Sequence, residues 1–281
     1  MEEKDQKLIA QIQAIRADHP FYGMKRVKLE MAKQGQKVAL NRISRVCNLY
    51  HLKPKSYCPH PKARDRNLPQ TGIPNLLKEL QEKVAENGSK NQEKSTKQNS
   101  KNAITKPNQA WCSDFTYLQI PGILGWYYLA TLIDVFTKEI VGFSLSKNHN
   151  TEMITSAFAV AVGKFGNVEI AHSDQGSEYR SAEYLNVLHS YQTKASNSAK
   201  ASPWENGFQE SFYGKFKPEL ELQNLPFCPS FRQIYDHLAK QMDYYNNRRI
   251  HTSIWEIPSL FRKRYEAKTR NRRQNLARNL R

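Results

Sequence analysis

WCSDFTYLQIPGILGWYYLATLIDVFTKEIVGFSL, residues 111–145, is the stretch of sequence that decides the fold of this chain. It contains three runs rich in aromatic and β-branched residues, at 111–120, 125–135 and 138–145. Runs of that composition predict strands. Because the connections between them are short, the three strands are expected to form an antiparallel meander.

Strands alternate with helices after the meander. The apolar spacing predicts a helix at 151–165, with Thr151 as its N-cap, and a short buried strand at 167–172. The further predicted elements are a helix at 181–191, a strand at 191–196, and helices at 204–220 and 230–247. Three strands followed by this alternation are the order of a ribonuclease H-like fold, an α/β architecture in which helices flank a mixed five-stranded sheet.

The first 60 residues predict a separate helical domain. Apolar periodicity indicates one helix that ends near residue 19 and two more at 24–33 and 41–50. Arg42 and Arg45 lie on the outward face of the last of these helices. Two short helices joined by a glycine-containing turn fit a helix-turn-helix that binds DNA. Any three-helix bundle would show the same periodicity.

The remaining boundaries follow from changes in composition. After the helical domain at 1–60, residues 61–106 are expected to be a connector with one amphipathic helix, LLKELQEKVAEN at 76–87, and then a flexible polar linker. The α/β core is expected to occupy residues 107–262. Residues 263–281 are expected to be a basic C-terminal tail.

The formal net charge of +17 is concentrated at the two ends of the chain. Residues 1–66 carry 15 Lys/Arg against 6 Asp/Glu, and residues 262–281 carry 9 against 1, so the residues between them balance. Basic ends around a neutral centre favour DNA binding at the ends and chemistry in the middle. Generic solubilising charge is the alternative, but it would not normally be concentrated in this way.

A cytoplasmic protein without membrane contact is expected. Mean hydropathy is −0.75, and no stretch reaches the ~18 to 20 apolar residues that a membrane span needs. The acidic N-terminus does not resemble a signal peptide. The four cysteines include no CxxC pair, which fits a reducing compartment.

Three acidic residues carry the candidate chemistry. Asp114 lies within the first predicted strand, Asp174 just after the strand at 167–172, and Glu210 in the helix at 204–220. Carboxylates at such positions can converge although they are far apart in sequence, and converging carboxylates in a basic protein predict a site for hard divalent cations that work on phosphodiesters. Each acid alone has an ordinary alternative: a solvent-facing strand residue, an Asx-turn, or a solvated helix residue.

Helical phasing adds residues to the face of Glu210. At ~100° per residue, Asn206, Tyr213 and Lys217 fall with Glu210 within a roughly 60° arc. A separate stripe suited to the core contains Phe208, Phe212 and Phe216. Lys217 is therefore expected to bind DNA phosphate beside the metal site, with Asn206 on the same face.

Together these segments resemble the DDE transposases of bacterial insertion sequences, within the retroviral-integrase-like superfamily. The resemblance is strongest to the catalytic second-frame product of two-frame elements. The matching segments are DHPFYGMKRV, PNQAWCSDFTYL, WYYLATLIDVFTKEIVGFSLS, HSDQGSEY, ENGFQESFYGKFK and DYYNNRRIHTSIWEIPSLF. In that family the acids of W-x-x-D-x-T-Y, H-S-D-x-G and E-S-F-(F/Y) form the catalytic metal triad, which maps to Asp114, Asp174 and Glu210.

The resemblance also assigns residues outside the triad. The family's Lys/Arg seven residues after the glutamate maps to Lys217, and its motif Y-N-x-x-R-x-H includes Arg249, which joins Arg42 and Arg45 as an expected DNA contact. Asp134 recurs in the family pattern and is interpreted as structural. The chain departs from the family before the catalytic helix, where its Gly-Asn is replaced around residues 201–202 and its Asp-Asn pair is Glu-Asn at 205–206.

The resemblance implies Mg²⁺, with Mn²⁺ as an alternative, at two ions per site. Water and then a DNA 3′-hydroxyl would attack in line, first nicking the ends of the element and then joining them to a target. The implied partners are DNA, further copies of the chain assembled on DNA, and an upstream-frame product that supplies another helix-turn-helix and a coiled coil. A nuclease of the same fold that does not join DNA and a DNA-binding protein without catalysis are the alternatives.

Overall fold

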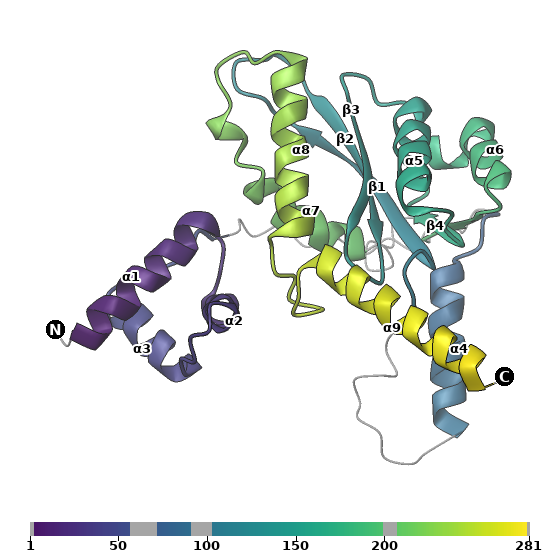
Figure 1. The fold of residues 1–281 in the computed structure, drawn as a ribbon. Coiled ribbons are helices and arrows are strands. Elements are labelled where there is room, and N and C mark those ends of the chain that lie inside the picture. Colours follow the sequence, from purple (N-terminus) through teal and green to yellow (C-terminus); the bar gives the residue numbers. More distant parts are fainter. Residues whose placement is uncertain (1–2, 57–71, 91–102, 199–206, 280–281) are drawn as a thin grey trace. The chain divides into compact units, whose positions relative to one another are not determined.

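A computed structural model describes residues 3–56, 72–90, 103–198 and 207–279. The chain divides into two compact units, Met1–His60 and Pro61–Arg281, which are described separately. Figure 1 shows the helices of the first unit and the sheet with its flanking helices in the second. Within the described residues, none of the helices combines the length and apolar character that crossing a membrane requires.

The first unit is built from three helices, as predicted. They are α1 (Glu3–Asp18), α2 (Met24–Lys33) and α3 (Leu40–Leu49). Their apolar faces meet in a small core that contains Ile12, Val27, Met31, Ile43 and Val46. Arg16 connects the end of α1 to the rest of the unit, because its guanidinium donates to the carbonyl oxygens of Tyr22 (3.2 Å) and Leu52 (2.8 Å).

The second unit contains the predicted mixed five-stranded sheet. Its strands are β1 (Ala110–Leu118), β2 (Tyr127–Asp134), β3 (Ile140–Ser146), β4 (Ile170–Ser173) and β5 (Lys194–Asn197). They lie in the order β3-β2-β1-β4-β5, with β1, β2 and β3 antiparallel and β4 and β5 parallel to β1. A meander followed by parallel strands that alternate with helices confirms the ribonuclease H-like fold.

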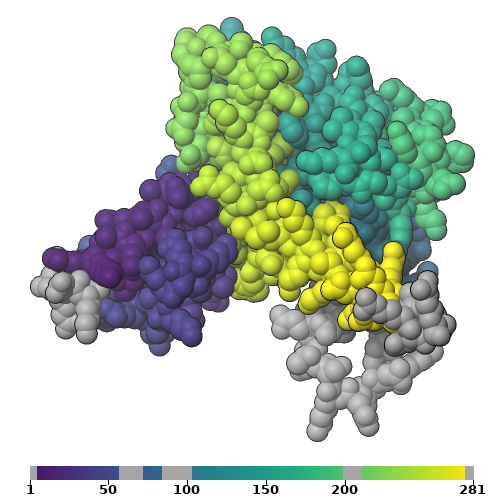
Figure 2. All heavy atoms as spheres, in the orientation of Figure 1, coloured from purple at the N-terminus to yellow at the C-terminus, as the bar shows by residue number. Residues whose placement is uncertain are grey.

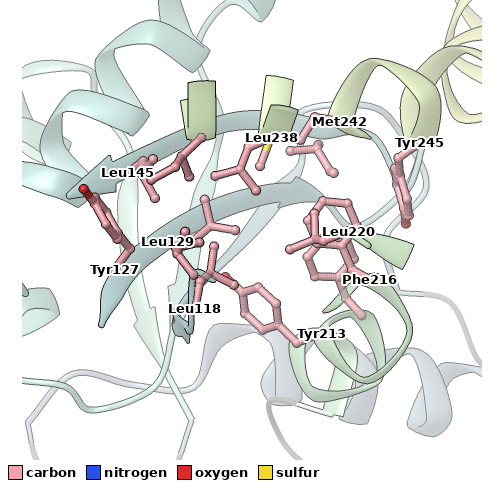
Figure 3. Packing of buried hydrophobic residues seen from close by; sticks show 14 of the residues in the cluster. Leu118, Tyr127, Leu129, Leu145, Tyr213, Phe216, Leu220, Leu238, Met242 and Tyr245 are labelled. Atoms are coloured by element: carbon pink, nitrogen blue, oxygen red, sulfur yellow. The ribbon is translucent and has the colours of Figure 1, made fainter. Parts of the chain in front are cut away.

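Helices cover both faces of the sheet. One face carries α5 (Thr151–Phe165) and α6 (Ala182–Ser190), and the other carries α7 (Gly207–Glu219) and α8 (Phe231–Asn247). Figure 3 shows the core on the α7–α8 side, where Tyr213 and Phe216 of α7 pack with Leu238 of α8 against Leu118 and Leu129 of the sheet. The phenylalanine stripe predicted on α7 is confirmed at its described positions, since Phe212 is buried together with Phe216.

Local sequence explains how closely α5 approaches the sheet. A Cβ added at Gly142 of β3 would lie 2.5 Å from the carbonyl oxygen of Ala157, so glycine permits this packing. The bounds of α5 are those predicted, but its N-cap is Asn150 and not Thr151. The Asn150 side chain accepts a hydrogen bond from the amide of Met153, and asparagine satisfies such an amide as well as threonine does.

Both outer strands of the sheet are bonded to atoms from other parts of the unit. At β3, the Asn246 side chain accepts from the amide of Ile140 (2.9 Å) and donates to its carbonyl oxygen (2.8 Å). At β5, the amide of Asn197 donates to the carbonyl oxygen of Pro74 (3.2 Å). The amide of Leu76, where α4 (Leu76–Lys90) begins, donates to the hydroxyl of Ser196 (2.9 Å). Part of the expected connector is therefore ordered against the core.

The expected basic tail is helical as far as the structure describes it. Helix α9 (Pro258–Asn279) begins within the range predicted for the α/β core, 107–262, and continues through residues 263–279. In Figure 2 it is the yellow segment on the surface of the second unit. Its first turn is fixed by buried Arg262, whose guanidinium donates to Glu139 (2.5 Å) and Asp134 (3.2 Å). No helix is predicted here from the sequence, because a long run of charged residues has little apolar periodicity.

Candidate active site

The candidate site lies where the pairing between the two central parallel strands ends. β1 pairs with β4 only over Ala110–Cys112, opposite Ile170–His172, although β1 continues to Leu118. The register sets Cys112 opposite His172, so Asp114 and Asp174 each lie two residues beyond that pair. Residues two apart on a strand point to the same face, and neighbouring strands lie about 4.8 Å apart. The topology therefore brings these two aspartates to corresponding positions at one edge.

Backbone amides hold the two carboxylates. Asp114 Oδ1 accepts a hydrogen bond from the amide of Phe115 (2.7 Å), and Asp174 Oδ1 accepts one from the amide of Gly176 (2.9 Å). The Asp174 side chain is exposed in the loop directly after β4, and Asp114 is partly exposed on β1. Both aspartates are thus on the elements that the sequence predicted for them.

The phenol of Tyr179 shows that the two aspartates share one environment. Tyr179 is buried, and its pKa is well above the usual value, first because of burial and next because of the charge of Asp114. The charge of Asp174 raises the same pKa by a smaller amount. One phenol therefore lies within the electrostatic reach of both carboxylates.

Helix α7 is fastened to the sheet at the level of Asp114. The Tyr213 hydroxyl donates to the carbonyl oxygen of Asp114 (2.8 Å) and lies 2.7 Å from the hydroxyl of Thr131, the residue paired with Asp114 across the β1–β2 ladder. Burial raises the pKa of Tyr213 well above its usual value, and the charge of Asp114 raises it further. Tyr213 thus stays a neutral hydrogen-bond donor that fixes the helix beside the site.

Lys217 lies one turn beyond Tyr213 on the same side of α7. Its pKa is lowered by partial burial, and the charge of Asp114 opposes that shift. Its Nζ lies 4.4 Å from the centroid of the Tyr117 ring on β1. The structure therefore brings Lys217 close to Asp114, which fits the predicted position of this residue beside the site.

The third predicted acid is described only in part. The backbone of Glu210 belongs to α7, three residues before Tyr213, but its side chain lies outside the described residues. Asn206 lies outside them altogether. Among the side chains that the structure does describe, no group of three or more His, Cys, Asp or Glu residues is arranged to hold a metal ion.

The described acids have the chemistry that a hard divalent cation requires. Carboxylate oxygens are the ligands preferred by Mg²⁺, which needs few of them because it also keeps water and takes phosphate oxygens. Asp114 supplies such oxygens from β1 and Asp174 from the loop directly after β4, and the helix that carries Glu210 is bonded to the backbone of Asp114. These residues fit a divalent cation.

The arginines predicted to bind DNA make ion pairs within the protein. Arg42 and Arg45 of α3 are exposed, as predicted, and both contact the carboxylate of buried Asp5 at 3.4 Å and 3.0 Å. Arg249 is buried and donates two hydrogen bonds to Glu219, at 2.6 Å and 2.7 Å. The arrangement of Arg249 favours a role in packing, whereas Arg42 and Arg45 still present exposed guanidinium groups at the surface.

Sequence reasoning gave no role to two tyrosines of this site. Helical periodicity placed Tyr213 on the same face of the helix as Glu210. Tyr179 lies in the HSDQGSEY motif that contains Asp174. Hydrogen bonding between Tyr213 and Thr131 joins residues 82 positions apart, so local sequence carries no signal for it. The burial of Tyr179 likewise depends on tertiary packing.

Solved structures with a similar fold include retroviral integrase cores. The catalytic core domain of the HTLV-2 integrase in complex with magnesium, in a trimeric form, has 21% sequence identity and a TM-score of 0.45. The match covers 55% of this chain and 96% of that chain. The catalytic core domain of the BIV integrase has 13% identity and a TM-score of 0.46, over 58% of this chain and 98% of that chain.

Relatives in sequence are proteins of insertion sequences. The transposase for insertion sequence element IS904 of Lactococcus lactis is 35% identical over 165 residues, 57% of this chain and 63% of that protein. The putative transposase InsK for insertion sequence element IS150 of Escherichia coli is 32% identical over 148 residues, 52% of this chain and 51% of that protein. An uncharacterized 31 kDa protein of insertion element IS600 from Shigella sonnei is 28% identical, over 87% of this chain and 82% of that protein. The chain thus spans between half and two thirds of the first two relatives.

Family models account for both units of the chain. Two models described as an integrase core domain match residues 104–203 and 191–258. A model described as an HTH-like domain matches residues 3–61. The resemblance to insertion-sequence transposases is confirmed by these matches and by the named relatives. The chain therefore belongs to the integrase-core family, with an HTH-like domain before the core.

Proposed function

We propose that this chain is a transposase that cleaves DNA at the ends of an insertion sequence and joins those ends to a target, with a divalent metal as cofactor. The observation that carries the proposal is the placement of Asp114 and Asp174 at the same end of the β1–β4 pairing, Asp114 on β1 and Asp174 directly after β4, with α7 bonded to the Asp114 backbone. The family and its insertion-sequence relatives supply the substrate class.

The proposed ligands are Asp114, Asp174 and Glu210, holding two Mg²⁺ ions, with Mn²⁺ as a substitute. Bound there, the ions would supply Lewis-acid stabilisation of the charge that develops on phosphate oxygens. The protein's own contribution is to keep its ligands in place before DNA arrives. The Phe115 and Gly176 amides orient the two aspartates, and Tyr213 fixes α7 against β1.

Lys217 has the properties of a phosphate contact at this site. Partial burial lowers the pKa of its ammonium, and the charge of nearby Asp114 opposes that shift. A cation beside the acidic ligands attracts the phosphate backbone toward them, and partial burial strengthens that attraction. Lys217 is thus proposed to position the DNA strand, while the acids hold the metal.

DNA is the proposed partner at the basic ends as well. The HTH-like domain with its exposed arginines and the basic helix α9 would each contribute salt-dependent, sequence-independent affinity. Assembly of several copies on DNA and a contribution from an upstream-frame product are part of the proposal. Action in the bacterial cytoplasm follows from the DNA substrate and from the relatives, which are bacterial.

A strand-transfer assay with pre-cleaved element ends tests the proposal. The DNA flanking the gene supplies those ends as inverted repeats. The wild-type protein with Mg²⁺ is expected to give joined product. We expect Asp114→Asn, Asp174→Asn and Glu210→Gln each to lower the rate of joining on the order of 10³-fold. Each change raises the activation barrier by several kcal/mol. All three variants should bind nonspecific DNA nearly as the wild type does.

The controls separate this proposal from its alternatives. Glu183→Gln, on α6, changes an acidic residue outside the site and should leave joining unchanged. Cleavage without any joined product would indicate a nuclease and defeat the transposase assignment. DNA binding without cleavage in the wild type would indicate a protein that only binds DNA. Full joining by one of the three acid variants would remove that residue from the ligand set.

A further inference from the structure

Two aromatic side chains are exposed next to each other near the candidate site. Tyr117 near the end of β1 is 58% exposed, and Trp126 just before β2 is 47% exposed. Their ring centroids lie 5.0 Å apart with an interplanar angle of 74°. The next residues along each strand, Leu118 and Tyr127, are paired with each other and buried. The hairpin is therefore held in the core while this pair of rings faces outward.

A cation completes this exposed pair. Lys217 Nζ lies 4.4 Å from the centroid of the Tyr117 ring, within the range of a cation–π contact. The same ammonium lies in the field of Asp114. Tyr117 follows Asp114 by three residues, roughly 10 Å along β1, and this odd spacing sends the two side chains toward opposite faces of the strand, so the link between them is Lys217. Lys217 thus connects the acidic site to the aromatic pair over a distance that a nucleotide can reach.

We propose that Tyr117 and Trp126, with Lys217, form a stacking surface for an unpaired base of the DNA strand whose phosphate lies at Asp114. This inference rests on the proposed function, since it assumes that DNA occupies the acidic site. Every base has a π-face, and exposed aromatic rings beside a cation bind single-stranded nucleic acid by stacking and by charge. An unpaired base suits this surface because a duplex keeps its bases stacked on each other.

Two other exposed aromatic residues lack this combination. Phe227 and Trp255 are also exposed, at 80% and 49%. Within the described residues neither has a cation over its ring, and neither is within reach of the Asp114 carboxylate through a shared lysine. Charge complementarity with DNA therefore distinguishes the Tyr117–Trp126 surface and identifies its occupant as nucleic acid.

The test uses the full chain and a short single strand that carries 2-aminopurine at the base beside the terminal phosphate. Stacking on an aromatic ring quenches this fluorophore, so binding to wild type is expected to quench it. Tyr117→Ala and Trp126→Ala should each lose most of the quenching and bind the single strand roughly 5- to 100-fold more weakly. Tyr117→Phe keeps the ring and should keep the quenching. Trp255→Ala is the matched control and should behave as wild type.

Each outcome bears on the proposal. Wild-type quenching by Tyr117→Ala would overturn it, and so would an equal loss in Trp255→Ala. If Tyr117→Ala or Trp126→Ala changed the oligomeric state without weakening the binding of the single strand, this would overturn the proposal in favour of a protein contact at this surface. The readout needs no catalysis, so quenching that depends on Tyr117 supports the stacking surface even if joining fails. Efficient joining without quenching leaves the proposed function intact and removes the stacking surface.

Discussion

Asp134 and Asp114 lie on the same β-hairpin, yet their surroundings differ completely. Asp134 is fully buried at the end of β2, and its carboxylate accepts from three backbone amides and from one guanidinium. These donors are the amides of Asn108 (2.7 Å), Phe136 (3.0 Å) and Thr137 (2.7 Å), and Nη2 of Arg262 (3.2 Å). The hydrogen-bonding capacity of this carboxylate is used inside the protein.

Asp114 is partly exposed and faces the end of the β1–β4 pairing. The groups around it include the Phe115 amide, from which its Oδ1 accepts a hydrogen bond, and the ammonium of Lys217, on whose pKa its charge acts against the effect of burial. A saturated, buried carboxylate stabilises a fold, whereas a carboxylate at an open edge is accessible to ligands. The comparison shows why the two acids of one hairpin are assigned different roles although both recur in the family pattern.

Among changes around buried Asp134, Arg262→Met is expected to have the largest effect on the free energy of unfolding. This change leaves Asp134 and Glu139 buried without their guanidinium partner. Removing one member of a buried ion-pair network costs about 3–5 kcal/mol. Urea denaturation followed by circular dichroism measures that loss. Arg232→Ala removes an exposed pair with Asp236 and should leave the unfolding midpoint nearly unchanged. Equal stability of Arg262→Met and wild type would show that this network does not hold α9 to the core.

The same isosteric change, Asp to Asn, should mainly lower stability at position 134 and mainly lower activity at position 114. Asp134→Asn places an NH₂ donor among backbone donors and weakens the contact with Arg262, so it should cost about 2–4 kcal/mol in unfolding free energy. Asp114→Asn should cost less than about 1 kcal/mol but remove joining activity. Urea denaturation and the strand-transfer assay on folded protein measure the two effects. The comparison breaks down if Asp114→Asn is the more destabilising of the two.

Tyr213→Phe tests the connection between α7 and the site. It removes the hydroxyl that bonds to Asp114 and Thr131 and should cost about 1–2 kcal/mol. Joining should slow as well, because α7 also carries Glu210. Tyr191→Phe, on the other face of the sheet, is the matched control for losing a hydroxyl. Unchanged stability and joining in Tyr213→Phe would show that packing alone positions α7.

The smallest expected effect is a pH dependence at Lys138, which is next to the Asp134 region. Burial lowers the pKa of Lys138 to about 8, against an ordinary value of 10.5, while the charge of Asp134 opposes this shift. Between those two pKa values the unfolded chain binds more protons than the native chain. Stability from this group therefore rises with pH over that window.

Lys138→Met isolates that contribution. The difference in unfolding free energy between wild type and Lys138→Met should shift in favour of wild type by on the order of 1 kcal/mol from pH 8 to pH 9. Urea denaturation at a series of pH values measures it. Burial raises the pKa of the Cys112 thiol to about 12, which gives this group a pH dependence of its own, but both proteins carry Cys112, so its contribution cancels in the difference. A difference that stays constant with pH would mean that Lys138 titrates at its ordinary value.

Much of the second unit was predictable because its elements are strongly patterned. The strands of the meander and helix α5 were placed within a few residues, since their apolar runs have the lengths and connections of a meander and an amphipathic helix. The element that carries each of Asp114, Asp174 and Glu210 also followed from the sequence. Position on an element is a local property, and local sequence determines it.

The missing predictions involve residues whose partners are distant in the chain. Arg262 donates to Glu139 across 123 positions, and Arg249 pairs with Glu219 across 30. The family resemblance implied a DNA contact for Arg249, and the run of basic residues after residue 262 indicated a basic tail, because a basic residue is usually solvated. Burial of a charged pair depends on tertiary structure, and that is why the buried positions of Arg249 and Arg262 were not predicted.

The bonded outer strands of the sheet limit how copies of this chain can associate. An exposed strand edge invites a second chain to add a strand, which leads to uncontrolled aggregation. Asn246 bonds the Ile140 backbone at one edge, and the segment from Pro74 to Leu76 bonds β5 at the other. Sheet extension at those positions would first have to break these bonds. Any association between copies of this chain is thereby directed away from these backbone positions and toward surfaces where side chains decide which copies fit together.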